Sequence, residues 1–337
     1  MKEILSRDNE HIINSLGDDI EKIKGKRILI TGSRGFLGQT IISLIEHLNE
    51  SLASRDQVDL VSIDYDDWDI CKPLDEHVSE GVVDYIINCA GIASPKKYLK
   101  SPLKTLDVSY VGTKNVLDFA MLRKTKSVLM FSSSEVYGTP EEGSIPTPES
   151  YVGSVTTFGN RSCYDIGKNV LETLCYVYHD SYSTPVNVLR PFNLYGPLMD
   201  FNDGRIVPNL CKSMITGKDF SIYGNGQQTR TYCYVADAVV YMLGVLLSGK
   251  SGEIYNIGSE DEEMTAAQIA QLSYSIIKPK GSKAVINPYP EEYPDQEPRR
   301  RCPNITKVKE LTSYSPQYSF EDGFRSCYEF FSDRESE

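Results

Sequence analysis

Short runs of apolar residues alternate with helix-like patterns from residue 26 to residue 257. Six of these runs predict strands: Arg27–Thr31, Asp59–Asp64, Asp84–Cys89, Ser127–Ser132, Val186–Arg190 and Glu253–Ile257. Strands that are apolar throughout and are separated by helices are typical of a parallel sheet with helices on both faces. The pattern therefore predicts an α/β fold built on a doubly wound parallel sheet.

Two further segments surround this pattern. Residues 1–24 carry apolar side chains at helical spacing, which predicts an amphipathic leader packed on the body of the protein or on a dimer mate. After residue 190 the chain is richer in Pro and Tyr. Three more helices are predicted there, over Ile206–Thr216, Ala236–Leu247 and Ala266–Ile277. We expect a sheet domain over 25–190 and a smaller lobe over 191–337, which would add mainly substrate-binding residues at the carboxyl edge of the sheet.

Composition narrows the possible partners. The chain has 337 residues, and its 35 Lys and Arg against 47 Asp and Glu give a formal net charge of −12. This acidic balance argues against nucleic acid as a partner. No apolar run approaches the ~18 residues that span a membrane, so we expect a cytoplasmic protein with no membrane partner. The eight cysteines form no C-x-x-C pair and only four histidines accompany them, so we expect reduced thiols and no metal site.

A glycine-rich turn follows the first predicted strand. Gly32, Gly35 and Gly38 stand in the spacing Gly-x-x-Gly-x-x-Gly, and a helical pattern follows them. Such glycines let the backbone turn tightly and approach a pyrophosphate, which then lies on the N-terminus of the helix. The strand before the turn and the helix after it predict a dinucleotide site of the Rossmann type. Phe36 and Leu37 of the same turn would also contact the cofactor.

The end of the second strand indicates which dinucleotide is bound. Asp64 can accept hydrogen bonds from the adenosine ribose and repels a 2′-phosphate, which favours NAD over NADP. Arg34 in the glycine turn could instead pair with a 2′-phosphate, so NADP stays the less favoured alternative. Asp69 and Ile70 are expected to flank the adenine, and Ala90, after the third strand, is expected to face the cofactor.

Tyr164 and Lys168 form the pattern Y-x-x-x-K, which places both side chains on one helix face, one turn apart. The charge of such a lysine is expected to lower the pKa of the phenol, while its ammonium can hold the nicotinamide ribose. The tyrosine would then act as a general base near neutral pH. Ser133, which follows the fourth predicted strand, would supply a hydroxyl partner.

Together these features resemble the extended short-chain dehydrogenase/reductase family of NAD-dependent nucleotide-sugar epimerases, dehydratases and decarboxylases. The resemblance covers the chain from about Lys26 to the C-terminus. It is carried by blocks at 93–106, 134–138, 161–173, 202–205 and 223–235, which occur in the order found in the family. Within the family these blocks are most similar to those of the UDP-glucuronate decarboxylases. A Rossmann-type sheet with a smaller C-terminal substrate-binding lobe is therefore implied.

The resemblance also implies a reaction with recycled NAD. Tyr164, assisted by Ser133, would remove the proton of the sugar's 4-hydroxyl while NAD takes the hydride from carbon 4. The 4-ketone would let UDP-glucuronate lose carbon dioxide, and return of the hydride would give UDP-xylose. Glu135 would join the catalytic group, and it follows Ser134 where dehydratases carry an Asp-Glu pair, which argues against dehydration. Arg301 would meet the carboxylate or assist reprotonation, unless it belongs to a solvated loop.

A set of substrate-binding residues follows from the same resemblance. It consists of Pro95, Tyr98, Asn193, Arg205, Tyr223, Arg230 and Arg301. The guanidinium forks of Arg205 and Arg230 suit the oxygens of a diphosphate. Tyr223 is either a platform for uracil or a residue of the core.

Other functions stay open on the sequence alone. A 4-epimerase of a UDP-uronate or another UDP-sugar would share the oxidation at carbon 4 but keep the carboxylate. A 4,6-dehydratase and a silent NAD-binding regulatory protein are less favoured, the latter because the catalytic residues are all present. Ile166 and Asn169 depart from the decarboxylase pattern and leave room for another 4-keto chemistry. A homodimer is expected from the apolar faces of the helix that carries Tyr164 and of the helix 108–122.

Overall fold

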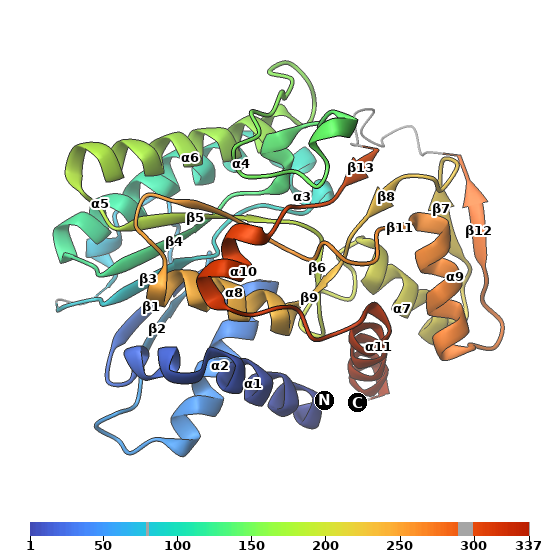
Figure 1. Cartoon of the computed structure of the whole chain (residues 1–337), viewed down its shortest axis with the longest axis horizontal. Coiled ribbons are helices and arrows are strands. Elements are labelled where there is room, and N and C mark those ends of the chain that lie inside the picture. Colours follow the sequence, from blue (N-terminus) through green and yellow to red (C-terminus); the bar gives the residue numbers. More distant parts are fainter. Residues whose placement is uncertain (79–80, 289–298, 337) are drawn as a thin grey trace.

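A computed structural model describes residues 1–78, 81–288 and 299–336 of the chain, and a six-stranded parallel sheet is its central element (Figure 1). The strands are β1 (Arg27–Thr31), β2 (Asp59–Ile63), β3 (Tyr85–Asn88), β4 (Ser127–Phe131), β5 (Val186–Pro191) and β10 (Ile254–Ile257). They stand in the order β2–β1–β3–β4–β5–β10. The chain thus turns back between β1 and β3, and such a switch point is where open α/β sheets bind ligands. The predicted fold class is confirmed.

Neighbouring residues of the central strands face opposite sides of the sheet and join different cores. Ile28 and Ile30 of β1 belong to the core on one face, whereas Leu29 belongs to the core on the other. In β4, Leu129 joins the first core and Val128 the second. All of these side chains are buried, which explains why these strands carry apolar residues on both faces.

Helices cover both faces of the sheet (Figure 1). One face carries α1 (Lys2–Leu16), α2 (Phe36–Ser51), α8 (Val235–Ser248) and α10 (Thr306–Thr312), and the other carries α4 (Pro102–Asp107), α5 (Thr113–Arg123) and α6 (Ser162–Tyr182). The single helix predicted over 108–122 is wrong in one respect, because a π-helical stretch, Val108–Gly112, joins α4 to α5. Gly112 packs tightly there, since a Cβ on it would lie 2.8 Å from Cγ2 of Ile70.

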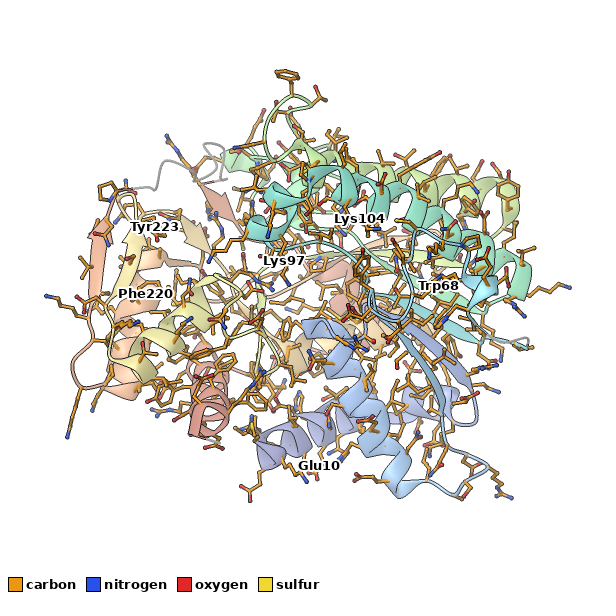
Figure 2. All side chains as sticks on the ribbon, turned by 180° about the vertical axis from the view of Figure 1, so that it is seen from behind. Glu10, Trp68, Lys97, Lys104, Phe220 and Tyr223 are labelled. Atoms are coloured by element: carbon orange, nitrogen blue, oxygen red, sulfur yellow. The ribbon has the colours of Figure 1, made fainter. Side chains whose placement is uncertain are left out.

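A smaller lobe, on the right of Figure 1, lies beside the carboxyl edge of the sheet. Its helices are α7 (Ile206–Thr216), α9 (Ala266–Ile277) and α11 (Phe320–Ser336). The short strands are β6 (Leu194–Tyr195), β7 (Phe220–Tyr223), β8 (Thr229–Arg230), β9 (Cys233–Tyr234), β11 (Met264–Thr265), β12 (Ala284–Asn287) and β13 (Arg300–Arg301). β8 pairs with both β11 and β13. Figure 2 shows Phe220 and Tyr223 at the opposite end of the molecule from Trp68.

The leader consists of α1 and a 3₁₀ helix, Gly17–Ile23, and it packs on α2 and α8 of the same chain. Ile12 and Ile23 join the main core. Asp8 is also buried, and its carboxylate accepts a hydrogen bond of 2.6 Å from the hydroxyl of Tyr234. The apolar face of the leader is therefore covered within one chain. No helix among the described residues is long and apolar enough to cross a membrane.

Candidate active site

The glycine turn is packed so tightly that side chains cannot replace two of its glycines. Gly32 has a φ of +66°, and a Cβ there would lie 2.7 Å from the backbone nitrogen of Ala90. A Cβ on Gly38 would lie 2.3 Å from the carbonyl oxygen of Gly32. α2 begins at Phe36, directly after Gly35, so its free N–H groups lie at this cradle. The geometry fits the pyrophosphate of a dinucleotide.

Asp64, at the end of β2, lies next to the same turn. Its Oδ2 accepts a hydrogen bond of 2.8 Å from the backbone nitrogen of Arg34. The guanidinium of Arg34 does not stand free, because it forms ion pairs of 2.8 Å with Asp66 and 2.9 Å with Asp67. Four charged side chains thus lie together at this turn, and three of them are acidic.

Asp69 and Ile70, predicted to flank the adenine, are both engaged with the protein. The carboxylate of Asp69 pairs with the ammonium of Lys104, and it also accepts a hydrogen bond of 3.0 Å from the backbone nitrogen of Cys71. Ile70 is buried and packs against Gly112. The structure describes these contacts, and their place beside an adenine stays a prediction.

The structure brings Ser133, Tyr164 and Lys168 together. Tyr164 and Lys168 lie one turn apart on α6, with the ammonium nitrogen 5.8 Å from the centroid of the phenol ring. The hydroxyl of Ser133 is a hydrogen-bond partner of the phenol. Lys168 Nζ donates a hydrogen bond of 2.6 Å to the carbonyl oxygen of Phe131, at the end of β4. All three side chains lie at the carboxyl edge of the sheet, where the switch point predicts a ligand.

The pKa values in this group differ from the expectation. Burial raises the pKa of Tyr164 to about 12, and the hydrogen bond from Ser133 offsets only part of that effect. Burial also lowers the pKa of Lys168 to about 8, because the ammonium is removed from water. The prediction of a lowered phenol pKa is therefore wrong for the protein without ligands, since burial outweighs the effect of a nearby cation.

Glu135 lies between two arginines. It belongs to a short 3₁₀ helix, Ser134–Tyr137. Its Oε2 accepts a hydrogen bond from the guanidinium of Arg301 and forms an ion pair of 2.7 Å with that of Arg161. Burial alone would raise the pKa of Glu135, but the charges of Arg301 and Arg161 outweigh it and lower the pKa. The side chain of Arg301 is only 11% exposed, so the solvated-loop interpretation of this arginine is wrong. The register of β13 and β8 places Arg301 beside Arg230.

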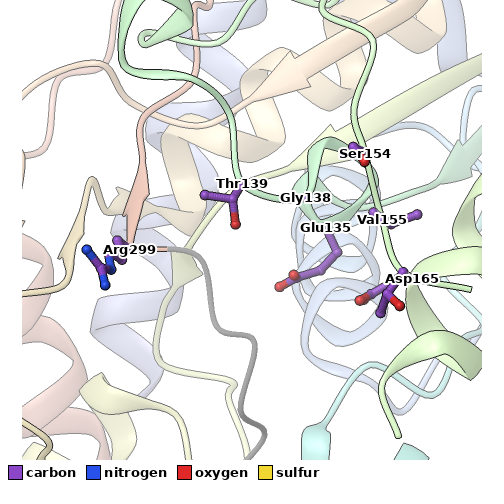
Figure 3. A pocket seen from close by; sticks show the side chains of 8 residues that line it. Glu135, Gly138, Thr139, Ser154, Val155, Asp165 and Arg299 are labelled. Carbon is purple, nitrogen blue, oxygen red and sulfur yellow. The ribbon is translucent and has the colours of Figure 1, made fainter. Parts of the chain in front are cut away.

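A cavity of about 300 Å³ opens at this cluster. It is lined by Glu135, Gly138, Thr139, Ser154, Val155, Thr156, Asp165 and Arg299. Figure 3 shows Glu135 and Asp165 on one side of the cavity and Arg299 on the other. A polar cavity with charged residues such as Glu135 and Asp165 in its lining can hold a hydrophilic substrate such as a sugar.

The predicted diphosphate-binding arginines lie in different surroundings. Arg230 is buried, and its Nη1 donates hydrogen bonds to the carbonyl oxygens of Thr229 at 2.7 Å and Arg299 at 3.2 Å. Arg205 precedes α7 and is held by both oxygens of Asp203, at 2.5 and 2.6 Å. The charge of Arg205 also acts to lower the pKa of the Tyr164 phenol.

The remaining substrate candidates lie in different parts of the structure. The Nδ2 of Asn193 donates a hydrogen bond of 3.1 Å to the carbonyl oxygen of Thr231, so this nitrogen serves the fold. Pro95 is exposed at the start of α3 (Pro95–Lys100), and Tyr98 of the same helix is buried against Tyr164. Tyr223 is half-buried at the end of β7 (Figure 2).

Sequence reasoning assigned no role to Arg161 or Asp165, although both belong to the cluster. The sequence does contain a clue to the role of Arg161. Arg161, Tyr164 and Lys168 recur at helical spacing, so Arg161 shares a helix face with the catalytic pair. The sequence does not show which residues from other parts of the chain contact this face. Only the folded chain shows that this face meets Glu135 and Arg301.

Comparisons with known proteins add a family and relatives. Residues 28–258 match the model of the NAD dependent epimerase/dehydratase family. UDP-glucuronic acid decarboxylase 1 of Danio rerio is 36% identical over 327 residues, a match that covers 91% of this chain and 73% of that protein. UDP-glucuronic acid decarboxylase 5 of Arabidopsis thaliana is 35% identical, over 88% of this chain and 86% of that protein.

The fold has a match among solved structures. UDP-glucose 4-epimerase from Thermotoga maritima, solved with UDP-glucose, superimposes with a TM-score of 0.77 at 23% identity, over 91% of this chain and 99% of that chain. This likeness shows the shared fold alone. Because the family model covers most of the chain and the two relatives exceed 30% identity, the protein belongs to the NAD-dependent epimerase/dehydratase family.

Proposed function

We propose that this enzyme converts UDP-glucuronate to UDP-xylose and carbon dioxide. The observation that supports this most is the charge around the cavity. Arg161, Arg230 and Arg301 stand against Glu135 and Asp165, so an excess positive charge persists even when both carboxylates are ionised. A sugar that itself carries a carboxylate suits such a site better than a neutral sugar does. The curated relatives named above are decarboxylases of the same class of substrate.

We propose NAD as the cofactor. The cation that would recognise a 2′-phosphate, Arg34, is paired with Asp66 and Asp67, and Asp64 adds a further negative charge. The turn at Gly32 would hold the pyrophosphate against the start of α2. When bound, NAD supplies a reversible acceptor for the hydride of carbon 4.

In the first step, Tyr164 would accept the proton of the sugar's 4-hydroxyl while the C4–H bond breaks. The hydrogen bond from Ser133 favours the phenolate, and Lys168 adds positive charge nearby as long as its ammonium is protonated. A pKa of about 8 keeps most of Lys168 protonated at neutral pH. The product of this step is a ketone at carbon 4.

The ketone makes decarboxylation possible because it stands β to the carboxylate carbon. When carbon dioxide leaves, the electron pair of the C5–C6 bond moves toward the ketone oxygen. Tyr164, now a neutral phenol, and Ser133 can donate hydrogen bonds to the resulting enolate oxygen. Arg301 can orient the carboxylate, since its Nε has no hydrogen-bond partner among the described residues. Protonation of carbon 5 and return of the hydride complete the cycle.

The proposed substrate contacts extend from the cavity toward the lobe. Arg230 and Arg205 would hold the diphosphate, and Arg205 would exchange part of its pairing with Asp203 for a phosphate oxygen. Tyr98 and Asn193 would contact the sugar. Pro95 and Tyr223 would complete the site by resemblance to the family.

The reaction is tested by incubating the protein with UDP-glucuronate and measuring the mass of the nucleotide sugar. The expected product has lost one carbon dioxide, and reduced cofactor does not accumulate. An unchanged mass would instead assign a 4-epimerase, and the loss of one water a 4,6-dehydratase. Bound NAD without any turnover of nucleotide sugars would support a regulatory protein.

We also propose that the protein is a homodimer. The apolar faces of α5 and α6 belong partly to the core, because Val116, Phe119 and Leu171 are buried between the helices and the sheet. A different apolar set is exposed on α4, α5, α6 and the π-helical stretch: Leu103, Tyr110, Leu122, Tyr176 and Tyr182. Exposed apolar patches of this kind mark interfaces. Light scattering at micromolar concentration that detects only monomers would contradict the proposal.

A further inference from the structure

Three buried polar atoms near Glu135 have no hydrogen-bond partner among the described residues. They are Oη of Tyr98, Oδ1 of Asp165 and Nε of Arg301. Each residue interacts with Glu135, either electrostatically or by the hydrogen bond of Arg301. A buried polar atom without a partner costs free energy, so such a group indicates a site that ligand or water completes. Of these three residues, Asp165 is the one to which the proposed mechanism assigns no role.

Asp165 is joined to Glu135 through a shared arginine. It stands in the first turn of α6, directly after Tyr164, and lines the same cavity as Glu135 (Figure 3). Its Oδ2 lies 3.6 Å from Nε of Arg161, while Nη2 of Arg161 lies 2.7 Å from Oε2 of Glu135. One guanidinium therefore holds one oxygen of each carboxylate, and Oδ1 of Asp165 has no hydrogen-bond partner within residues 1–78, 81–288 and 299–336.

The two carboxylates differ in their affinity for a proton. The arginines overcome burial at Glu135 and lower its pKa, so it stays ionised at neutral pH. At Asp165, burial is the largest influence, and it outweighs the charge of Arg161 with help from the negative charge of Glu135, which raises the pKa to about 6. Two titratable groups whose environments separate their pKa values in this way are suited to different tasks. Asp165 is the carboxylate that can exchange a proton near neutral pH.

Charged or titratable side chains from several elements surround Asp165 and affect its protonation. The charged and titratable neighbours are Arg161, Cys163 and Tyr164 at the start of α6, Glu135 in the 3₁₀ helix, Arg301 in β13, Tyr98 in α3, and Arg299 across the cavity. The neutral side chains of Thr139, Ser154 and Thr156 complete the lining.

Building on the decarboxylation proposed above, we propose that Asp165 relays the proton that carbon 5 takes up after carbon dioxide has left. In this step a C5–H bond forms as a water molecule of the cavity gives up a proton to the enolate. That water regains a proton as the O–H bond of Asp165 breaks. Asp165 is then a carboxylate paired with Arg161, and solvent at the mouth of the cavity returns its proton. Asp165 does not touch the substrate in this step. It holds and reprotonates the water molecule that does, so we call it a positioning residue.

Single-turnover experiments separate this role from the others. The NAD-loaded enzyme is mixed with UDP-glucuronate, and formation of reduced cofactor, release of carbon dioxide and reoxidation of the cofactor are followed in turn. In Asp165→Asn the first two steps should keep the parent's rates, while reoxidation should slow about ten-fold or more, because carbon 5 waits for its proton. Asp165→Glu should recover part of the loss. Asp180→Asn removes an exposed carboxylate from the same helix and should match the parent.

The pH profile gives a readout that a structural role would not move. The protonated fraction of Asp165 falls as pH rises through about 6, so reoxidation in the parent should slow progressively above that pH. Asp165→Asn should lack this decline. If the variant does not fold, the parent's profile alone is sufficient, and a reoxidation rate that stays constant from about pH 5 to about pH 8 overturns the relay.

Two further results would contradict the relay. One is an Asp165→Asn enzyme with the parent's reoxidation rate and profile. The other is an Asp165→Asn enzyme that folds like the parent and in which all three steps slow equally. A parent enzyme that releases no carbon dioxide contradicts the proposed function itself, so the two failures are distinguished in the same experiment.

Discussion

The ring of Tyr98 is stacked on the ring of Tyr164, with centroids 5.1 Å apart and planes inclined by 14°. Tyr98 is almost completely buried, and its hydroxyl has no hydrogen-bond partner in the described part of the chain. Packing of the ring therefore positions the phenol of Tyr164 from one side, while Ser133 holds its hydroxyl. Aromatic pairs of this kind contribute about 0.5–1.5 kcal/mol beyond the burial of their area.

Substitutions at Tyr98 should separate the ring from its hydroxyl. Tyr98→Ala should lower the free energy of unfolding by about 3 kcal/mol or more, because a buried ring is lost, and it should slow the oxidation at carbon 4. Tyr98→Phe keeps the stack and should keep both stability and oxidation rate. If the hydroxyl binds the sugar, Tyr98→Phe should raise KM about ten-fold. An alanine variant that oxidises substrate at the parent's rate would show that the stack does not position Tyr164.

Tyr164 and Lys168 should respond differently to removal. Tyr164→Phe takes away the proton acceptor but not the ring, so hydride transfer should be lost while NAD stays bound. Lys168→Ala should lose both activity and affinity for NAD, because the ammonium would hold the ribose. Calorimetric binding of NAD and single-turnover reduction of the cofactor test both statements. Normal turnover in Tyr164→Phe would disprove its role as the base.

The same pair predicts a pH dependence of the oxidation step. Below about pH 8, the rate should rise with pH, because the phenolate fraction of Tyr164, whose pKa is about 12, increases. Above about pH 8, Lys168 loses its proton and the rate should level off, since the loss of ammonium offsets the gain of phenolate. A rate that continues to rise far beyond this pH would show that the charge of Lys168 is not used.

Arg301 and Arg230 should affect different parameters. Arg301→Ala should slow the steps after oxidation, because its partner Glu135 and the uronate carboxylate lose a cation. Arg230→Ala should raise KM and weaken UDP as a competitive inhibitor, because the diphosphate loses an anchor. Arg300→Ala is the matched control, since that guanidinium pairs with Glu263. If Arg301→Ala equals Arg300→Ala in every parameter, the carboxylate is recognised by other residues.

Cofactor preference should depend on the ion pairs of Arg34. Replacing Asp66 and Asp67 with Asn leaves that guanidinium without its carboxylates, so the affinity for NADP should rise about ten-fold. Adding Arg34→Ala to the double variant should abolish the gain. Dissociation constants for NAD and NADP measured by calorimetry test this. An unchanged affinity for NADP in the double variant would mean that Asp64 alone excludes the 2′-phosphate.

The features that could be predicted from the sequence are those set by the spacing of residues close together in the chain. The central strands carry apolar residues on both faces because both faces are buried, and the bounds of α7 and α9 agree with the predicted helices. The glycine turn was recognisable because its spacing, the strand before it and the helix after it are adjacent in sequence. Y-x-x-x-K was recognisable for the same reason.

The rest depends on tertiary contacts. Glu135 and Arg301 meet although they are 166 residues apart, and no spacing rule connects them. The pKa of Tyr164 is set by burial under neighbouring elements, which a motif does not contain. Likewise, helical periodicity shows that α5 is amphipathic but not which apolar residues the sheet covers. Phe119 is buried while Leu122 is exposed, and only the packing of α5 on the sheet distinguishes them.

The most direct test of the central claim is the fate of carbon 6. UDP-glucuronate labelled at that carbon is incubated with the NAD-loaded enzyme, and the label is measured in carbon dioxide and in the nucleotide sugar. We predict that the label leaves as carbon dioxide in equal amount to the UDP-xylose formed, with no net reduction of the cofactor. Label that stays in a nucleotide sugar of unchanged mass would contradict decarboxylation and assign the same site to epimerisation.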